Sequence, residues 1–391
     1  MVSGYVNNHN NPDAYTNVMQ GQVLLNGSQV PKIIWNQIKI LIISNKDEFD
    51  IERDMLVTET LPKLQQYFLT QGIYVYFIDC NLNWNFDLSK NPYHILRYMK
   101  ELKDAYQTST GHFLLTFVGN KYGQIVLPIE LSTIDFHNIK NSASDLGKDI
   151  KLLEEWYLLD DKLSPPMYKL KDPDENFSTI PSRSISTYDI NSCENQEWNE
   201  AYFNLVDLFL SVLNEKSNMK SMHDIQLLSY VEMLFNYSIK LSPSGSMCIL
   251  RQLDGLNEKS KGNESYIDLL PGGRLDKIRQ EKLKRFRESI INKLSNNNDN
   301  KNDFKIEDNR TILNIPWKDN GEFQSDDSDY QRYLRTLNAS IFLRIKSLNQ
   351  HFNDLSILNH YKNSEQILYN EILVHLTYYS KYSSYTCLGF D

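Results

Sequence analysis

The chain has 391 residues, of which 41% are hydrophobic and 23% charged, so it has enough apolar side chains for a buried core. Its formal net charge of −9 argues against a wide nucleic-acid-binding surface, because contacts to phosphates require Lys and Arg. The four cysteines form no C-x-x-C pair, and no apolar run reaches the length of a membrane-spanning helix. We therefore expect a cytoplasmic protein with reduced thiols, no metal site, no nucleic-acid partner and no membrane insertion.

The first half of the chain predicts strands that alternate with helices. After a polar lead-in over 1–35, which we expect to be flexible, apolar β-branched runs predict strands at 38–44, 73–79 and 112–119. Amphipathic spacing predicts one helix between the first two strands, kinked at Pro62, and another over 93–108. Crossovers of this length form right-handed βαβ units, so the strands should form a parallel sheet.

The rest of the chain is mainly helical in pattern, with helices predicted over 148–159, 196–215, 223–240, 273–295, 328–354 and 364–382. Two short runs, 247–252 and 311–316, have the composition of strands. We predict that they complete a five-stranded, flavodoxin-like parallel sheet of an α/β fold. The domain would then consist of a first part over 36–147, a large helical insertion over 148–240, and remaining strands and C-terminal helices over 241–391. The alternative is a separate helical domain after residue 190.

Five residues are candidates for ligand binding because they lie at the carboxyl ends of predicted strands or just after them, and ligands of open parallel sheets bind beyond these ends. These residues are Ser44, Asp79, Gly119, Tyr122 and Gly123. The glycines would let backbone approach a ligand closely, and the Ser and Asp side chains could hydrogen-bond a ribose or phosphate. The alternative is that all five are caps and turn residues that serve the sheet, since position in a fold names no ligand.

Charged clusters leave two further questions open. The triplet Glu52-Arg53-Asp54 could hold an acidic ligand group, or it could be a solvated face or an internal ion pair. The basic helix 273–295 could bind an anionic partner, or its cations could form a solvated face with the interspersed carboxylates. No P-loop, zinc-protease, serine-hydrolase or kinase motif occurs in the chain.

Four segments together resemble the N-terminal module of the NACHT and WD-repeat proteins. In chain order they are Ile42-Ile43-Ser44 with Glu52-Arg53-Asp54 and Pro62-Lys63-Leu64; Phe77-Ile78-Asp79 with Trp84; Gly119-Asn120-Lys121-Tyr122-Gly123 with Leu127-Pro128; and Trp156-Tyr157 with Asp160-Asp161 and Pro165-Pro166-x-Tyr168. Each is short, but their order and spacing match the family. The family-motif residues are Glu52, Arg53, Trp156, Tyr157, Pro165 and Pro166.

This resemblance implies a TIR-like module that regulates or binds proteins within a signalling scaffold, without a cofactor. Its expected partners are other proteins, or the NACHT and repeat portion of the same polypeptide, which follows the module in this family. The resemblance thus implies that the chain is a fragment.

The resemblance also implies an enzymatic alternative, a TIR-like hydrolase that cleaves NAD. Glu101, within Tyr98-Met99-Lys100-Glu101-Leu102, is similar to the helix glutamate that supports this cleavage in enzymatic TIR domains. A carboxylate at that position could stabilise an oxocarbenium-like ribosyl centre. Ser44 would orient the ribose, and NAD would be bound only under this alternative.

Overall fold

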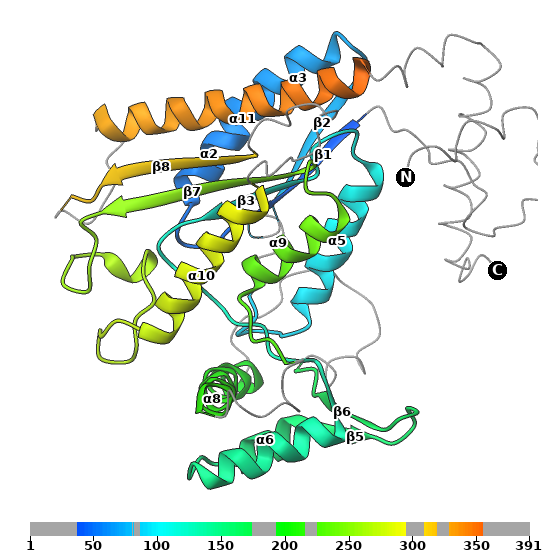
Figure 1. Ribbon diagram of the computed structural model, residues 1–391, viewed down its shortest axis with the longest axis vertical. Coiled ribbons are helices and arrows are strands. Elements are labelled where there is room, and N and C mark those ends of the chain that lie inside the picture. Colours follow the sequence, from blue (N-terminus) through cyan, green and yellow to red (C-terminus); the bar gives the residue numbers. More distant parts are fainter. Residues whose placement is uncertain are drawn as a thin grey trace, which may run out of the picture. The chain divides into compact units, whose positions relative to one another are not determined.

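A five-stranded parallel sheet forms the centre of the protein in a computed structural model that describes residues 37–79, 81, 87–173, 193–215, 225–294, 309–318 and 328–354 (Figure 1). The predicted lead-in over 1–35, the predicted helix over 364–382 and Trp84 lie outside these described residues. Among the described helices, none is both long enough and apolar enough to cross a membrane.

The strands are β1 (Gln37–Ile43), β2 (Tyr74–Asp79), β3 (Leu114–Val118), β7 (Ser246–Asp254) and β8 (Arg310–Pro316), in the order β2-β1-β3-β7-β8. All neighbours in this sheet pair in parallel. The order is that of flavodoxin-like sheets. The prediction of one α/β sheet from five runs is therefore confirmed. The alternative of a separate helical domain after residue 190 is wrong for β7 and β8, because both strands pair within this sheet.

Helices cover both faces of the sheet, as Figure 1 shows. One face packs against α2 (Asp50–Met55), α3 (Leu61–Leu69) and α11 (Ser328–Asp354). The other packs against α5 (His94–Thr108), α9 (Tyr230–Leu241) and α10 (Lys277–Leu294). Strand β1 supplies Ile40 and Ile42 to the first core and Leu41 and Ile43 to the second. Because both faces are buried there, the second half of the strand, residues 40–43, reads as a continuous apolar run in the sequence.

The helix predicted between β1 and β2 is interrupted ahead of Pro62. A π-helical turn, η1 (Leu56–Thr60), lies between α2 and α3, and the proline stands in the first turn of α3. Proline has no N–H to donate to the preceding turn, which explains why the regular α-helical ladder breaks there.

The segment between β3 and β7 contains a second sheet that the sequence analysis did not predict. It consists of β4 (Glu130–Ser132), β5 (Tyr157–Asp160) and β6 (Met167–Leu170), all antiparallel, in the order β4-β6-β5. Three helices accompany it, α6 (Thr133–Asp145), α7 (Lys151–Trp156) and α8 (Cys193–Glu215).

The helix predicted over 148–159 is wrong in its last residues. It ends at Trp156, and the chain continues as β5, which pairs with β6 from Tyr157 to Asp160. The apolar residues at 157–159 are compatible with a helix when only the local sequence is considered. They form a strand because they pair with β6, which follows the Pro165-Pro166 connection. The helix predicted from 223 begins instead at Tyr230, where Ser229 caps it by accepting from the Glu232 N–H.

Candidate functional site

The carboxyl ends of the parallel strands form the edge where ligands of such sheets bind. In the observed strand order the chain changes direction across the sheet between β1 and β3, so the switch point lies between these two strands. Ser44 follows β1, and Gly119 follows β3. The side chains at this switch point therefore decide what the edge can bind.

Arg53 of α2 joins the ends of β1 and β2. Its side chain, 3% exposed, donates from Nη1 to Ser44 Oγ at 2.9 Å and places Nε 3.2 Å from Asp79 Oδ2. A further carboxylate, that of Asp50, accepts from Nη2. Asn81 Nδ2 donates to Ser44 O at 3.1 Å, so the end of β1 is bonded on two sides. Ser44 and Asp79 thus already have partners within the protein.

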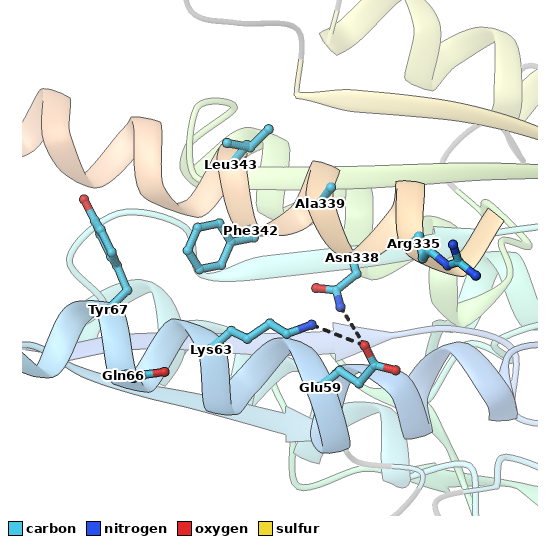
Figure 2. Close-up of a pocket in the computed structure, with 9 residues that line it drawn as sticks. All are labelled: Glu59, Lys63, Gln66, Tyr67, Arg335, Asn338, Ala339, Phe342 and Leu343. Atoms are coloured by element: carbon cyan, nitrogen blue, oxygen red, sulfur yellow. Dashed lines mark hydrogen bonds and ion pairs between the residues drawn. The ribbon is translucent and has the colours of Figure 1, made fainter. Parts of the chain in front are cut away.

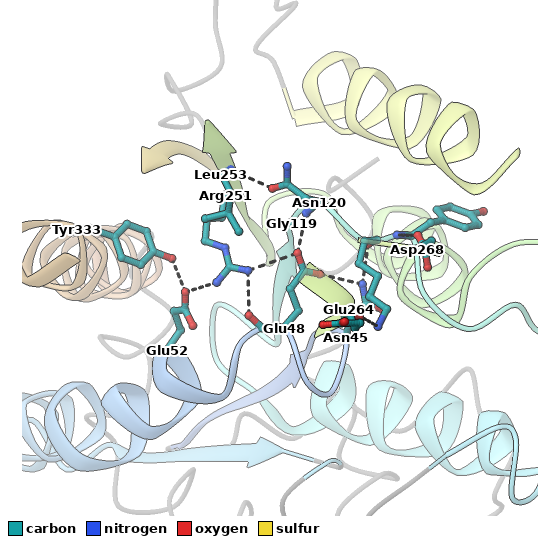
Figure 3. Close-up of polar contacts among 12 residues, drawn as sticks. Asn45, Glu48, Glu52, Gly119, Asn120, Arg251, Leu253, Glu264, Asp268 and Tyr333 are labelled. Atoms are coloured by element: carbon teal, nitrogen blue, oxygen red, sulfur yellow. Dashed lines mark hydrogen bonds and ion pairs between the residues drawn. The ribbon is translucent and has the colours of Figure 1, made fainter. Parts of the chain in front are cut away.

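Glu48 fills the crevice between β1 and β3 (Figure 3). Its carboxylate accepts from the Asn120 N–H at 2.6 Å and from Asn45 Nδ2 at 3.2 Å. A Cβ on Gly119 would lie 1.8 Å from Glu48 Oε1, and one on Gly123 would lie 2.0 Å from Asn45 Oδ1. Because the two glycines have no Cβ, the side chains of Glu48 and Asn45 can lie directly against the backbone. They occupy the space through which a ligand would reach that backbone.

Arg251 of β7 is the cation that faces Glu48. Only 1% exposed, it donates from Nη2 to Glu48 O at 2.9 Å, and the same nitrogen lies 3.4 Å from Glu48 Oε1. Its Nη1 donates to Glu52 Oε1 at 2.6 Å, and the Tyr333 OH of α11 donates to that oxygen at 3.0 Å (Figure 3). The guanidinium also lies 4.0 Å from the centre of the Phe49 ring. One buried side chain thus connects the β1–α2 loop, α2, β7 and α11.

The loop after β3 meets a second buried carboxylate, that of Asp268. The N–H groups of Tyr122 and Gly123 donate to its two oxygens at 2.5 Å and 3.2 Å. The Tyr122 OH donates to Glu232 Oε2 at 2.6 Å, and Lys121 Nζ donates to the Glu264 carbonyl at 3.0 Å. The loop is therefore held on several sides by internal contacts.

Burial changes the acidity of these groups. It raises the pKa of Glu48 to about 7, although Arg251 and the hydrogen bonds from Asn45 and Asn120 lower it. Burial likewise raises the pKa of Asp268 and of Glu232. Within the described ranges, no three His, Cys, Asp or Glu side chains gather in a way that could hold a metal ion.

The five residues singled out as ligand-binding candidates lie at the carboxyl ends of β1, β2 and β3 or in the loops that follow, and the side chains of Ser44, Asp79 and Tyr122 are buried. Their internal contacts are those of residues that organise the edge. A ligand-binding role for them stays a prediction.

The triplet Glu52-Arg53-Asp54 is not a solvated face. Glu52 and Arg53 are 1% and 3% exposed, and both form ion pairs within the protein, while Asp54 alone is exposed. The cations of α10 are also largely engaged: Arg279 pairs with Asp276, and Arg287 donates to two backbone carbonyls.

Glu101 lies on α5, away from the switch point. Its carboxylate is 3.9 Å from Lys39 Nζ, and the side chain is 27% exposed. Lys39 precedes Ser44 by five residues on an extended strand, a separation of roughly 16 Å along β1. Glu101 is thus engaged near the middle of β1, and its proposed role in cleaving NAD remains an expectation.

The remaining family-motif residues lie in the second sheet or directly beside it in the chain. Trp156 packs edge-on against Trp198 with ring centres 4.8 Å apart, and the Tyr157 OH donates to the Pro128 carbonyl at 2.8 Å. Pro165 and Pro166 stand between β5 and β6. Trp156 and Tyr157 therefore stabilise the segment inserted between β3 and β7, at a distance in the chain from the switch-point residues.

Sequence reasoning missed Glu48, Arg251 and Asp268 as members of this site. Arg251 had a signal: it directly follows the apolar run 247–250 within a predicted strand, and a buried cation requires an anionic partner. The other two lie in loops whose sequences do not indicate burial.

Two hollows lined by described residues bear on function. A groove of about 720 Å³ lies between α3 and α11 and is lined by Glu59, Lys63, Gln66, Tyr67, Arg335, Asn338, Ala339, Phe342 and Leu343 (Figure 2). A polar cleft of about 450 Å³ lies beside the end of β7, and its lining includes Asn120, Asp254, Lys284, Arg287 and Glu288. The cleft shares Asn120 with the donors of Glu48, so it borders the switch point.

The chain is similar to NACHT and WD repeat domain-containing protein 2. It is 27% identical to the human protein over 269 residues and 27% identical to the mouse protein over 274 residues, with 65% of this chain covered in both cases. The aligned region spans about 15% of the length of each relative. No protein-family model and no solved structure matches the chain. The resemblance seen in the four sequence segments is thereby confirmed.

Proposed function

We propose that this chain is a regulatory, protein-interaction module of a scaffold protein of the NACHT and WD-repeat type, acting in the cytoplasm. Support comes from one contrast within the fold. In this structure the donors at the switch point are taken by the Glu48 carboxylate, whereas the groove between α3 and α11 is open along its length to a large partner. The similarity to two NACHT and WD-repeat proteins indicates the kind of polypeptide in which such a module works.

The groove has the features of a protein-binding surface. Tyr67, Phe342 and Leu343 supply apolar area, and Leu343 is 59% exposed. Glu59 and Lys63 form an ion pair at the rim, with nitrogen and oxygen 3.3 Å apart (Figure 2). Exposed apolar area rimmed by charged groups is typical of a site that a partner covers.

The occupant that we propose is the NACHT and repeat portion of the same polypeptide. Helix α11 forms one wall of the groove and is the last element described before the chain continues toward Asp391. A domain that follows in the same polypeptide would be covalently linked to this module, which sets its effective concentration at the groove on the order of millimolar. Even a weak contact would then hold the two parts together.

The test has two steps. The transcript is first sequenced past Asp391, where we expect a G-x-x-x-x-G-K-[ST] sequence. The encoded downstream portion is then expressed separately and mixed with this chain, and binding is measured by calorimetry. Leu343→Asp should weaken binding roughly tenfold or more, because it places a charge on the apolar wall.

Ile134→Asp is the matched control, since Ile134 is 69% exposed on α6, outside the groove. It should bind like the unmodified chain. The absence of a downstream P-loop, or equal binding by Leu343→Asp and Ile134→Asp, would contradict the proposal.

A further inference from the structure

The loop after β3 directs its backbone N–H groups at anions. Asn120 N–H donates to Glu48, and the N–H groups of Tyr122 and Gly123 donate to Asp268. Successive backbone donors at the carboxyl end of a parallel strand are a common means of binding phosphate. In this protein, carboxylates from two other loops of the same chain occupy those donors.

We propose that the crevice at the switch point is a binding site for the phosphate group of a small phosphorylated ligand, closed by Glu48, and that the ligand's phosphate takes the place of this carboxylate. Glu48 accepts from the three kinds of donor that a phosphate would use: the Asn120 N–H, the Asn45 side-chain amide and the Arg251 guanidinium. Gly119 lies beside the Glu48 carboxylate and has no side chain there, so a bound anion could contact the backbone directly.

An unused donor beside Glu48 supports this inference. Arg251 is 1% exposed, and among the described residues its Nε has no hydrogen-bond partner. In the planar guanidinium, Nε–H and Nη2–H lie along the same edge, and Nη2 is the nitrogen that contacts Glu48. Glu48 contacts this edge only through Nη2, so Nε–H stays without an acceptor, whereas a phosphate bound there could accept from both donors in the bidentate arrangement usual for guanidinium and phosphate.

The polar cleft beside β7 provides room for the rest of the ligand. Asn120 lines this cleft, so a group bound there adjoins the crevice. Lys284 and Arg287 of α10 supply positive charge to its wall, and Asp254 and Glu288 supply negative charge. The cleft therefore suits the polar body of a phosphate monoester such as a sugar phosphate better than an apolar group.

The site is tested on the full chain with inorganic phosphate and ribose 5-phosphate as probes. Binding is measured by calorimetry for the unmodified chain, Glu48→Ala and Glu232→Ala. We expect weak phosphate binding by the unmodified chain and binding roughly tenfold tighter by Glu48→Ala, because no internal carboxylate competes. Ribose 5-phosphate should bind more tightly than phosphate to both proteins.

Glu232→Ala is the matched control. It removes another partly buried carboxylate beside the same loop, but one that accepts from the Tyr122 OH and from none of the loop's backbone N–H groups described above. Its phosphate affinity should equal that of the unmodified chain. Because the groove is not involved, Leu343→Asp should also bind phosphate normally, so this test and that of the proposed function fail independently.

Three results would refute the proposed phosphate site. The first is an unchanged phosphate affinity in Glu48→Ala, and the second is an equal gain of phosphate affinity in Glu232→Ala. The third is ribose 5-phosphate binding no more tightly than phosphate. If Glu48→Ala does not fold, amide NMR of the unmodified chain decides. Phosphate should shift the Asn120 and Gly119 signals, and unchanged signals at saturating phosphate would refute the proposal.

Discussion

Glu48 stands in an unusual position for a carboxylate. It is 2% exposed, and its contacts are with Asn45, Asn120 and Arg251. Burial destabilises the ionised carboxylate by removing its hydration, and this effect is larger than the stabilisation that these three partners provide. Burial therefore raises the pKa of Glu48 from 4.5 to about 7.

We therefore expect a pH-dependent contribution of Glu48 to stability. Because its pKa is higher in the folded protein, the contribution is fully present below the unfolded value of 4.5 and is lost as the pH rises through about 7. The free energy of unfolding should fall between about pH 5 and about pH 8 by a few kcal/mol on this account, at about 1.4 kcal/mol per unit of pKa difference.

Urea unfolding of the unmodified chain and of Glu48→Gln over this range measures the contribution as a difference. The difference is needed because other groups titrate too: burial lowers the pKa of His112 to about 4, which destabilises the fold at low pH. Glu155→Gln, at an exposed position of α7, is the control variant. An unchanged slope in Glu48→Gln would show that this carboxylate does not titrate in the range.

At the scale of the element, the loop Gly119–Gly123 forms the junction between the sheet and its neighbours. Besides its contacts to Glu48 and Asp268, it receives Arg287 Nη1 at the Gly119 carbonyl, 2.7 Å away, and its Asn120 Oδ1 accepts from the Leu253 N–H at 3.0 Å. The loop is thus defined by contacts from α10 and β7 as well as from the β1–α2 loop.

Gly119→Ala should destabilise the protein by about 2–4 kcal/mol, because the new Cβ would displace the Glu48 carboxylate from its buried donors. Gly147→Ala is the control, since no atom lies within 4 Å of a Cβ there, and only its positive φ of 67° opposes the change. Adding Glu48→Ala to Gly119→Ala should make the pair less costly than the sum of the single changes. Strict additivity in chemical denaturation would exclude a direct clash.

At the scale of the whole molecule, Arg251 connects parts of the chain that lie far apart in sequence. Through Glu48 and Glu52 it joins β7 to the β1–α2 region, and through the shared oxygen of Glu52 it reaches Tyr333 of α11. Breaking a buried ion pair by removing one partner leaves an uncompensated charge inside the protein.

Arg251→Met should therefore lower the free energy of unfolding by about 3–5 kcal/mol. Arg251→Lys should also be destabilising, since an ammonium group lacks the planar fork that reaches two carboxylates. Combining Arg251→Met with Glu48→Gln and Glu52→Gln should recover part of the loss, because no buried charge is then left alone. Hydrogen exchange should show faster opening of the first turns of α11 in Arg251→Met; unchanged exchange there would contradict the link to this helix.

The sequence by itself determined the strands of the parallel sheet, most of its helices and the order of its parts. Runs such as Ile38–Ile43 are apolar at every position that faces a core. This pattern can be recognised from neighbouring residues alone, without knowledge of the tertiary structure. It also located Ser44, Asp79 and Gly119 at the ends of strands. The resemblance of short segments to NACHT and WD-repeat proteins was likewise available from the residues alone.

Only the tertiary structure decided which side chains fill the switch point and where the second sheet forms. Glu48 and Arg251 are 203 residues apart, and their contact forms only when the folded chain brings the β1–α2 loop against β7, so no local pattern encodes it. The β5–β6 pairing likewise prevails over the helical pattern at residues 157–159. The hydrogen bonds between these strands join residues that come close only after folding. Burial of charge and pairing of strands are properties of the assembled fold, so they followed from its geometry and not from the order of the residues.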